Sequence, residues 1–428
     1  MNNSQNGTTV NLLVDHLFRH KAGQIIAVLT RIFGMENLAL AEDVVQETFI
    51  KALQQWPHSG VPSNPGGWIL QVARNQALDV LRRDSTFRDK QQQVAAALEE
   101  QMGRAAQSEA DPLTQEFEDD QLVLMLTCCH PSFTREAQTA LILKTLCAFS
   151  TAEIARAYLT QESTIAQRLV RAKRRIGEQN IRFELPDGVA LAERIQTLLE
   201  VLYLMFNEGY GATEGDLLIR RDLCEEAIRL TTLLARSRPG NLPEAHALLS
   251  LMFLQASRFA ARLDTEGDLV PLAEQDRSLW DRGNIRLGLQ HLELSAGGNR
   301  LTEYHLQAAI AAHHATAPSH AETNCKAILE DYNELLELNP SPLWKLNRAV
   351  AVAEVDGADA ALAELDRLAG FTALQSYYLY HATRGEMYSR LNRRSEAAAC
   401  YRKALTLVGT APERRFLERK LQPSYGRV

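Results

Sequence analysis

Three observations predict that this chain folds entirely from α-helices. Strong helix formers, chiefly Ala, Leu, Glu, Arg and Gln, dominate its composition. Apolar residues recur at spacings of three and four nearly everywhere, and this spacing places them on one face of a helix. Stretches that alternate polar and apolar residues, as half-buried strands do, are almost absent. At 428 residues, the chain has room for two to three helical domains with large cores.

Clusters of Pro, Gly and polar residues break the helical pattern. The breaks lie at Pro57 to Gly67, from about Asp84 to Asp120, around Pro186 to Gly188 and around Pro340 to Pro342. We therefore expect domains over residues 8–84, 119–183 and 187–428. Residues 85–118 are rich in Gln, Glu and Ala, and we expect them to form a flexible linker.

A helix is predicted over residues 41–53 of the first domain. Its apolar stripe follows the i, i+3, i+4, i+7 pattern and consists of Ala41, Val44, Val45, Thr48, Phe49, Ala52 and Leu53. The opposite face carries Glu42, Asp43, Gln46, Glu47 and Lys51. One face of this helix is therefore core, and the other is exposed and acidic.

The loop from Pro57 to Gly67 leads into a second predicted helix, over residues 68–83. Its core stripe consists of Ile69, Val72, Ala73 and Val80. The side chains that point away from this stripe are Gln71, Arg74, Asn75 and Arg82. The exposed face of this helix is therefore rich in amides, and the helix ends in basic residues.

Residues 150–176 follow the pattern of a helix-turn-helix, and they are the most informative stretch of the chain. Ser150 is placed to cap a first helix, and Glu153 can reach back to that cap. The turn falls near residues 159–162. The second helix places Ile165, Leu169, Ala172 and Ile176 on one stripe, because successive residues are about 100° apart.

The outward face of this second helix suits the major groove of DNA. It carries Thr164, Gln167, Arg171 and Arg174, and five basic residues with no acidic one lie between Arg168 and Arg175. Lys and Arg neutralise phosphates, while Gln and Arg also reach base edges. The alternative is a solvated basic face in an ordinary bundle. Basic charge is local here, because the net charge of the whole chain is −7.

Residues 8–183 resemble bacterial extracytoplasmic-function (ECF) sigma factors. The segments Ala41–Phe49 (AEDVVQETF) and Gly67–Arg83 (GWILQVARNQALDVLRR) are similar to region 2 of that family, and the helix-turn-helix is similar to region 4. This resemblance implies a subunit that binds RNA polymerase core, through the clamp helices and flap, and recruits it to promoter DNA.

The resemblance also implies a role for each exposed face. The face that would bind a basic hairpin of the polymerase clamp carries Glu42, Asp43, Gln46 and Glu47. Residues implied to hold the −10 element, with one base turned out of the stack, are Asn64, Trp68, Arg74, Asn75, Arg82 and Arg83. Residues implied to bind the −35 element are Thr164, Gln167, Arg168, Arg171, Arg174 and Arg175. The alternatives are a solvated acidic face and a core position for Trp68.

The sequence of the last domain predicts helical repeats. Residues 382–412 match a tetratricopeptide (TPR) unit in spacing, and residues 343–368 read as a second helix pair of similar length. About three repeats are needed for a stable solenoid, so earlier helices must complete the array. Repeat surfaces are extended and concave, and we expect this domain to bind a ligand or a small protein partner.

Two further stretches, residues 203–211 and 272–281, resemble the fused C-terminal region of an ECF subgroup with a TPR-like extension. The residues that match its motifs are Asn207, Glu208, Asp276, Arg277, Trp280 and Asp281. We expect them to form a polar cluster that binds a ligand or clamps the tail onto the sigma domains. The alternative is an Asp–Arg network that only fixes helix register.

Other functions find little support in the sequence. Cys128-Cys129-His130 has no second ligand pair at zinc-finger spacing, and we expect core thiols there. The chain has no glycine-rich phosphate loop, nucleophile elbow or paired catalytic carboxylates, so we expect neither an enzyme nor a cofactor. Its apolar runs are too short for a membrane span, and its first residues do not resemble a signal peptide. We therefore expect a cytoplasmic protein with reduced cysteines.

Two competing functions each explain part of the sequence. A one-component transcriptional regulator would bind an operator and sense a ligand with its helical tail, but it leaves residues 41–83 unexplained. A helical scaffold with no DNA role would require the pattern of residues 150–176 to arise by chance. Transcription that depends on polymerase core separates the sigma factor from both.

Overall fold

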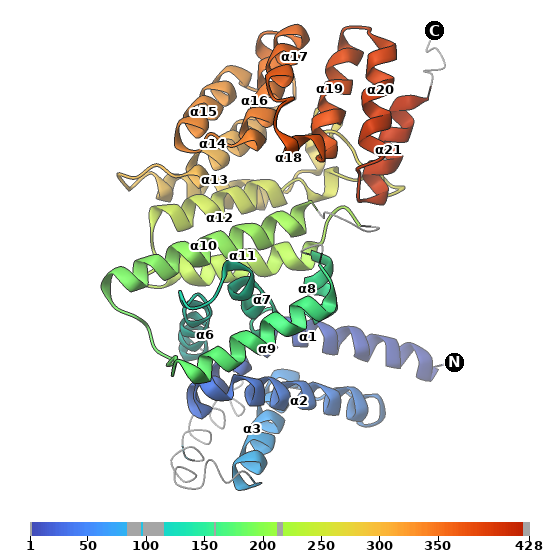
Figure 1. The fold of residues 1–428 in the computed structure, drawn as a ribbon. Coiled ribbons are helices and arrows are strands. Elements are labelled where there is room, and N and C mark those ends of the chain that lie inside the picture. Colours follow the sequence, from blue (N-terminus) through green and yellow to red (C-terminus); the bar gives the residue numbers. More distant parts are fainter. Residues whose placement is uncertain (1, 84–95, 97–114, 158–159, 212–216, 423–428) are drawn as a thin grey trace. The chain divides into compact units, whose positions relative to one another are not determined.

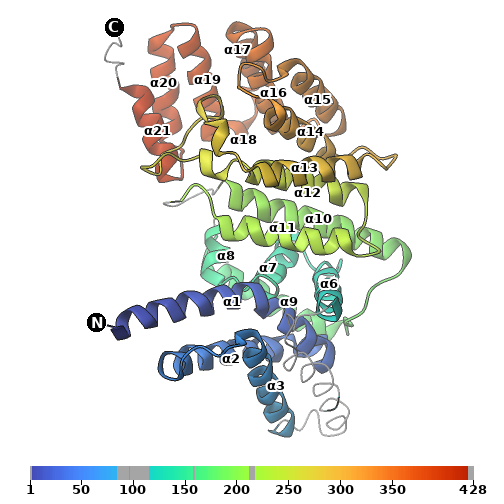
Figure 2. The same cartoon turned by 180° about the vertical axis from the view of Figure 1, so that it is seen from behind.

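The computed structural model describes residues 2–83, 96, 115–157, 160–211 and 217–422, and Figures 1 and 2 show its helices. All regular secondary structure in the described residues is helical, apart from one isolated β-bridge between Leu263 and Leu269. The prediction of an all-α fold is therefore confirmed. The chain divides into two compact units, residues 1–201 and residues 202–428.

The first part of unit 1 consists of α1 (Asn2–Phe33), η1 (Met35–Asn37), α2 (Leu38–Ser59) and α3 (Pro65–Arg83). Gly34, at φ 93°, provides the left-handed turn between α1 and η1. Between α2 and α3, the rings of Trp56 and Trp68 meet edge to face at 5.3 Å, and Thr48 Oγ1 donates to Gln76 Oε1 at 2.5 Å.

The second part of unit 1 contains α6 (Gln115–Cys128), α7 (Arg135–Thr145), α8 (Thr151–Ala157) and α9 (Glu162–Glu178). The start of α6 lies inside the range that was predicted as linker, so helix replaces linker from Gln115 onward. The rest of the predicted linker lies outside the described residues, apart from Ala96. These helices and α1–α3 form one unit, where the sequence predicted two separate domains.

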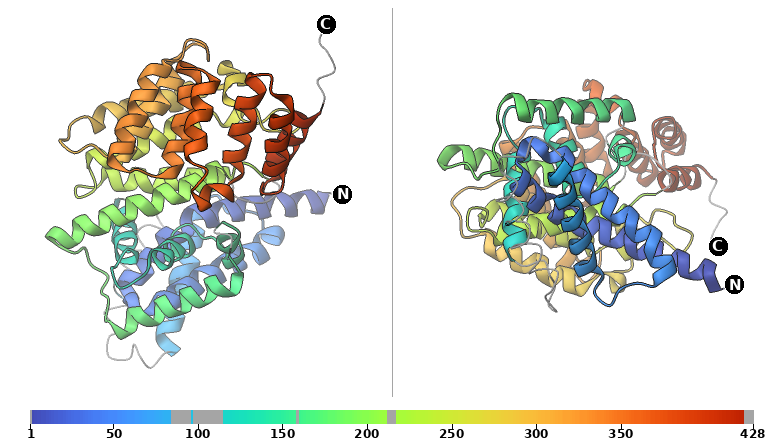
Figure 3. Two further views of the ribbon diagram at one scale, coloured as in Figure 1. Left: turned by 45° about the horizontal axis from the view of Figure 1, so that its top comes forward. Right: turned by 90° about the horizontal axis from the view of Figure 1, so that it is seen from below.

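Helix α1 is the centre of this unit, as the right-hand view of Figure 3 helps to follow. It packs against α2 and α3 and also against α6 and α7. Residues 22–30 are all buried. Nine successive residues of a helix point in every direction around its axis, so this stretch is covered on every side. A helix that is buried all round belongs to the interior of a core.

Unit 2 begins within α10 (Gly188–Tyr210). Its next helices are α11 (Arg221–Arg236), α12 (Pro243–Ala256), η4 (Phe259–Ala261), η5 (Leu272–Glu274), η6 (Arg277–Leu279), α13 (Arg282–Ser295) and α14 (Glu303–Thr316). The last are α15 (Cys325–Leu338), α16 (Pro342–Val355), α17 (Ala358–Arg367), α18 (Thr372–Gln375), α19 (Tyr378–Arg390), α20 (Arg394–Leu405) and α21 (Ala411–Leu421).

The two predicted helix pairs of the tail are present as α16 with α17 and α19 with α20. Gly385 lets the second pair pack closely, because a Cβ at this position would lie only 2.7 Å from Cε1 of Tyr401. Successive helices from α14 to α17 contact one another in chain order. The tail is therefore built by stacking neighbouring helices.

Candidate nucleic-acid interface

The predicted cap of the helix before the turn is present. The backbone N–H of Ser150 donates to Glu153 Oε2 at 2.7 Å, and the N–H of Glu153 donates to Ser150 Oγ at 3.1 Å. This reciprocal pair satisfies two amides at the start of α8. Across the turn, Thr151 Oγ1 donates to Glu162 Oε1 at 2.7 Å and ties α8 to the start of α9.

Helix α9 separates an apolar stripe from a polar face, as the sequence predicted. Ile165, Leu169, Ala172 and Ile176 are buried, which holds α9 against α7 and α8. Of the residues assigned to the −35 element, Gln167, Arg171, Arg174 and Arg175 are exposed, while Thr164 and Arg168 are half-buried.

The exposed side chains of α9 differ in their partners. Arg174 pairs with Glu178 at 3.1 Å, and Arg175 donates to the carbonyl of Ser132 at 3.0 Å. Gln167 and Arg171 have no hydrogen-bond partner among the described residues. Val170, which is not among the residues predicted to bind DNA, is 66% exposed on the same face. An apolar group there is suited to contact a thymine methyl group.

Lys173 departs from the other basic residues of α9, because it faces the protein. Its Nζ donates to Glu42 Oε2 at 2.5 Å, and the Glu42 side chain is only 6% exposed. The prediction of an exposed Glu42 is therefore wrong. This carboxylate is covered where α9 comes against η1, next to the start of α2. Asp43, Gln46 and Glu47 are exposed as predicted.

One apolar residue of α2 also departs from the predicted stripe. Leu53 is 40% exposed, and Ile50 beside it is 50% exposed. Both lie on the side of α2 that carries Gln46 and Glu47. The exposed surface of α2 is therefore partly apolar as well as acidic.

The residues assigned to the −10 element have three different environments. Asn64 Oδ1 accepts from the N–H of Gly67 at 2.8 Å and caps the start of α3. Trp68 is half-buried against Trp56, which is intermediate between the predicted contact and the alternative core position. Asn75 Oδ1 accepts from Gln71 Nε2 at 3.3 Å and from Arg74 at 3.4 Å.

The basic end of α3 carries Arg82 and Arg83. Arg82 is exposed and pairs with Asp79 at 3.3 Å, an interaction that a phosphate can replace at little cost. The side chain of Arg83 lies outside the described residues.

Of the six motif residues of the tail, four lie within residues 276–281, and Arg277 contacts Trp280 there. Glu208 pairs with Arg220 at 3.4 Å, while Asn207 is exposed. Asp276 accepts from the N–H of Ser278 at 2.8 Å, and Asp281 accepts from that of Asn284 at 3.0 Å. Asp276 therefore caps η6 and Asp281 caps α13, and a single polar cluster of all six residues stays a prediction.

Arg277 and Trp280 hold the helices of the tail together. The guanidinium of Arg277 donates to the carbonyls of His314 and Ala317, at the end of α14. Trp280 is buried, and two guanidinium groups lie over its ring, Arg277 at 4.4 Å and Arg258 at 5.4 Å from the ring centre. Both cation–π contacts and the negative end of α14 stabilise these charges.

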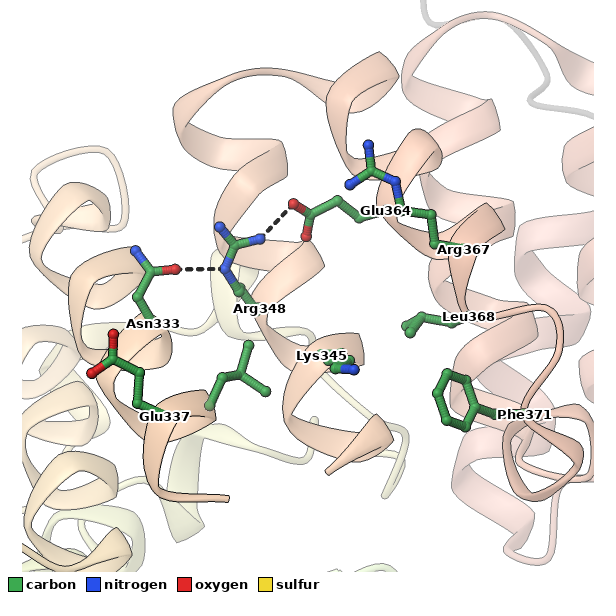
Figure 4. A pocket seen from close by; sticks show the side chains of 9 residues that line it. Asn333, Glu337, Lys345, Arg348, Glu364, Arg367, Leu368 and Phe371 are labelled. Carbon is green, nitrogen blue, oxygen red and sulfur yellow. Dashed lines mark hydrogen bonds and ion pairs between the residues drawn. The ribbon is translucent and has the colours of Figure 1, made fainter. Parts of the chain in front are cut away.

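A hollow of about 680 Å³ lies over α15, α16 and α17 (Figure 4). At its centre, Arg348 donates to Asn333 Oδ1 at 2.7 Å and pairs with Glu364. Lys345 lies 5.5 Å from the ring centre of Phe371 at one side. The hollow therefore combines charged groups with an apolar wall.

The described part of the chain has neither a metal-binding cluster nor a membrane-spanning helix. No group of three His, Cys, Asp or Glu side chains there is arranged to hold a metal ion. Cys128 and Cys129 are buried, and burial raises the pKa of Cys128 to about 12. None of the described helices is long and apolar enough to cross a bilayer.

Comparisons with known families match two segments of the chain. Residues 17–86 match the sigma-70 region 2 family, and residues 194–296 match a family of unknown function (DUF6596). An uncharacterized protein of Rhizobium meliloti (strain 1021) is 38% identical over 402 residues, which cover 93% of this chain and 92% of that protein.

A second similarity concerns part of the chain. A protein of Mycobacterium tuberculosis, described as the probable ECF RNA polymerase sigma factor SigI, is 27% identical over 168 residues. These cover 39% of this chain and 56% of the mycobacterial protein.

Proposed function

The chain belongs to the same family as the Rhizobium meliloti protein and carries a sigma-70 region 2, and from this premise we propose that it is an ECF-type sigma factor. In this function it binds RNA polymerase core and directs initiation at a specific class of promoter. Its mechanism is binding, without a catalytic step of its own.

The observation that carries the proposal is the polar face of α9, in the same chain as a sigma region 2. Buried Ile165 and Leu169 orient this helix, so that Gln167, Val170 and Arg171 lie together on its outside. These side chains match the donors, acceptors and methyl groups of the major groove. Arg171 has no partner among the described residues that it would have to give up on binding, so it is the side chain best placed to contact a base or phosphate.

Helices α2 and α3 supply the remaining contacts in this proposal. Asp43 and Glu47 would face a basic surface of the polymerase clamp, where complementary charge raises the association rate and excludes wrong partners. The exposed Asn75 and the half-buried Arg74 of α3 would contact the opened −10 strand. Asn64 acts indirectly, because as the cap of α3 it fixes where this helix begins.

The tail is proposed to set the activity of the sigma domains through a ligand or partner. Its helices stack in chain order, and the hollow around Arg348 offers both charged and apolar contacts. Such a domain can take the place of a separate anti-sigma factor. We propose that it activates, in line with the fused ECF subgroup that its motifs resemble.

The test is reconstituted transcription. Transcript starts mapped after overexpression of the full chain would supply candidate promoters, and purified chain would then be added to bacterial core polymerase on those templates. We expect run-off transcripts only when both proteins are present. A chain that binds the same DNA tightly without core, and directs no transcript with it, would instead be the one-component regulator.

A further inference from the structure

Three half-buried arginines of the tail, Arg258, Arg262 and Arg277, lie in the turns that follow α12. Each guanidinium group lies over an aromatic ring. Arg258 and Arg277 share the ring of Trp280, and Arg262 lies 3.8 Å from the ring centre of Tyr210. We call these three residues the arginine cluster.

The members of the arginine cluster are close enough to repel one another. Burial lowers the pKa of Arg258, and the charge of Arg262 lowers it further. Burial and the charge of Arg258 likewise lower the pKa of Arg277. Burial, together with the charges of Arg258 and Arg277, lowers the pKa of the neighbouring His314 to about 3. Arg258 therefore lies between two like charges and beside a neutral imidazole.

No carboxylate of the described residues pairs with the arginine cluster. Arg384, elsewhere in the tail, shows the usual arrangement, because it also lies over two tyrosine rings but pairs with Asp366. Every hydrogen bond of the arginine cluster goes instead to a neutral oxygen. The acceptors are the side chains of Gln255, Gln275 and Thr323 and the backbone carbonyls of Tyr210, His314 and Ala317.

These neutral surroundings offset only part of the charge. The negative end of a helix, here α14, is equivalent to roughly half an elementary charge, so about two of the three positive charges have no counter-charge. Charged groups withdrawn from water are normally paired with an opposite charge. The arginine cluster is therefore suited to receive an anion.

A neutral donor at the same place also has no acceptor. Trp280 is 2% exposed, and its Nε1 has no hydrogen-bond partner among the described residues. This N–H lies on the edge of the ring that Arg258 and Arg277 share. Buried indole N–H groups usually find a partner, and leaving one unmade is costly.

We propose that Arg258, Arg277 and Trp280 bind a phosphate group. A phosphate carries a charge of about −1.5 to −2 at pH 7, which matches the charge that is left over, whereas a carboxylate carries only one negative charge. A guanidinium group has five N–H groups in a planar fork, and Arg258 donates only two of them to glutamine oxygens. The others are available to phosphate oxygens, and the indole N–H adds one more donor.

This proposal gives a chemical class to the ligand of the tail. Binding stands on the geometry of Arg258, Arg277 and Trp280 alone. Only the use of that binding to set transcription rests on the proposed function.

Calorimetric titration of the full chain with inorganic phosphate tests the site. The buffer contains chloride at constant ionic strength, so that screening is the same throughout. We expect saturable binding of one phosphate per chain and much weaker binding of acetate. Glycerol 3-phosphate, titrated in parallel, distinguishes the two sources of the group, because tighter binding than inorganic phosphate assigns the site to a phosphate ester and weaker binding assigns it to the free ion.

Two variants locate the site. Arg258→Gln removes one charge, and we expect at least a tenfold loss of phosphate affinity. Trp280→Phe keeps an aromatic ring beside the guanidinium groups but removes the N–H, and we expect a loss of about threefold to tenfold. Arg384→Gln is the matched control, because this arginine also lies over aromatic rings but already has a carboxylate partner, and its phosphate affinity should equal that of the wild type.

Each result decides for or against the site. The proposal is overturned if the folded wild-type chain shows no saturable binding, if acetate binds as tightly as phosphate, or if Arg258→Gln keeps the wild-type affinity. Should Arg258→Gln fail to fold, as judged by circular dichroism, Trp280→Phe decides, and an unchanged affinity there refutes the site. These titrations need neither polymerase nor promoter, so their failure leaves the sigma function standing, and a failed transcription assay leaves the phosphate site standing.

Discussion

Replacing Lys173 by Met tests how much the contact with Glu42 stabilises the first unit. Met preserves the length of the aliphatic stem but removes the charge. Glu42 is then buried with no partner, since its Oε1 already has none among the described residues. We expect weaker protection of α1 and α2, because both the charge and the packing of α9 on η1 support them.

The magnitude follows from the burial of the two side chains. Removing one partner of a fully buried ion pair costs about 3–5 kcal/mol. Lys173 is 26% exposed, so water screens the pair, and we expect a loss of about 2–3 kcal/mol. The double variant Glu42→Gln with Lys173→Met leaves no buried charge. It should therefore lie within about 1 kcal/mol of the wild type.

Hydrogen exchange read by mass spectrometry is the appropriate assay, because a two-unit chain need not unfold in one step. The local opening free energy would be measured for peptides that cover residues 22–30 and α2. Lys144→Met on α7 is the matched control, because Lys144 has no ion pair among the described residues. If Lys173→Met exchanges no faster than this control, the reasoning about a buried, paired Glu42 is refuted.

Four further predictions follow from other parts of the molecule. Arg171→Ala should weaken binding to promoter DNA by about 1–3 kcal/mol with native helicity, and unchanged affinity in a filter-binding titration would contradict its role. Asp43→Arg with Glu47→Arg should reduce capture by purified core polymerase at least tenfold, and equal capture would place the polymerase contact elsewhere. Truncation after Arg182 should strongly lower transcription in vivo, and full transcription from a truncated chain that accumulates stably would show that the tail inhibits the sigma domains. Burial and a neighbouring histidine lower the pKa of His291 from 6.5 to about 4, so the folded chain resists a proton that the unfolded chain binds. Unfolding titrations should therefore show that stability falls between pH 6.5 and 4, with a smaller fall in His291→Phe.

The structure refines the truncation experiment. Glu200 of α10 pairs with Arg135 of α7 at 2.9 Å, and Leu198 and Leu199 are fully buried. The first half of α10 therefore belongs to the unit that the truncation is meant to preserve. A second truncation after Val201, at the unit boundary, separates loss of the tail from loss of this packing.

Features that depend on local sequence could be predicted. The cap at Ser150 and the buried stripe of α9 are set by residues three and four apart, and both are present. The all-α fold follows from the same periodicity. The caps at Asp276 and Asp281 also have a local sequence signal, which is an aspartate just before a helix. The family resemblance predicted a polar cluster for these residues and not caps.

Features that depend on distant contacts could not be predicted in this way. The burial of Glu42 depends on Lys173, 131 residues further along the chain. Leu53 has the spacing of a core residue, but it is 40% exposed, because none of the described helices covers its end of the stripe. Burial of residues 22–30 on every side of α1 has no amphipathic signature, because no face of this stretch is left exposed.

The double packing of α1 restricts which substitutions this chain can accept. A side chain in an ordinary core must match one set of neighbours, but residues 22–30 must fit two surfaces that belong to different parts of the chain. A change that suits α2 and α3 can still be rejected by α6 and α7. In a scan of all single substitutions, this helix should therefore tolerate fewer replacements than α2. The substitutions that lower the signal of a transcription reporter should differ from those that lower the signal of a folding reporter.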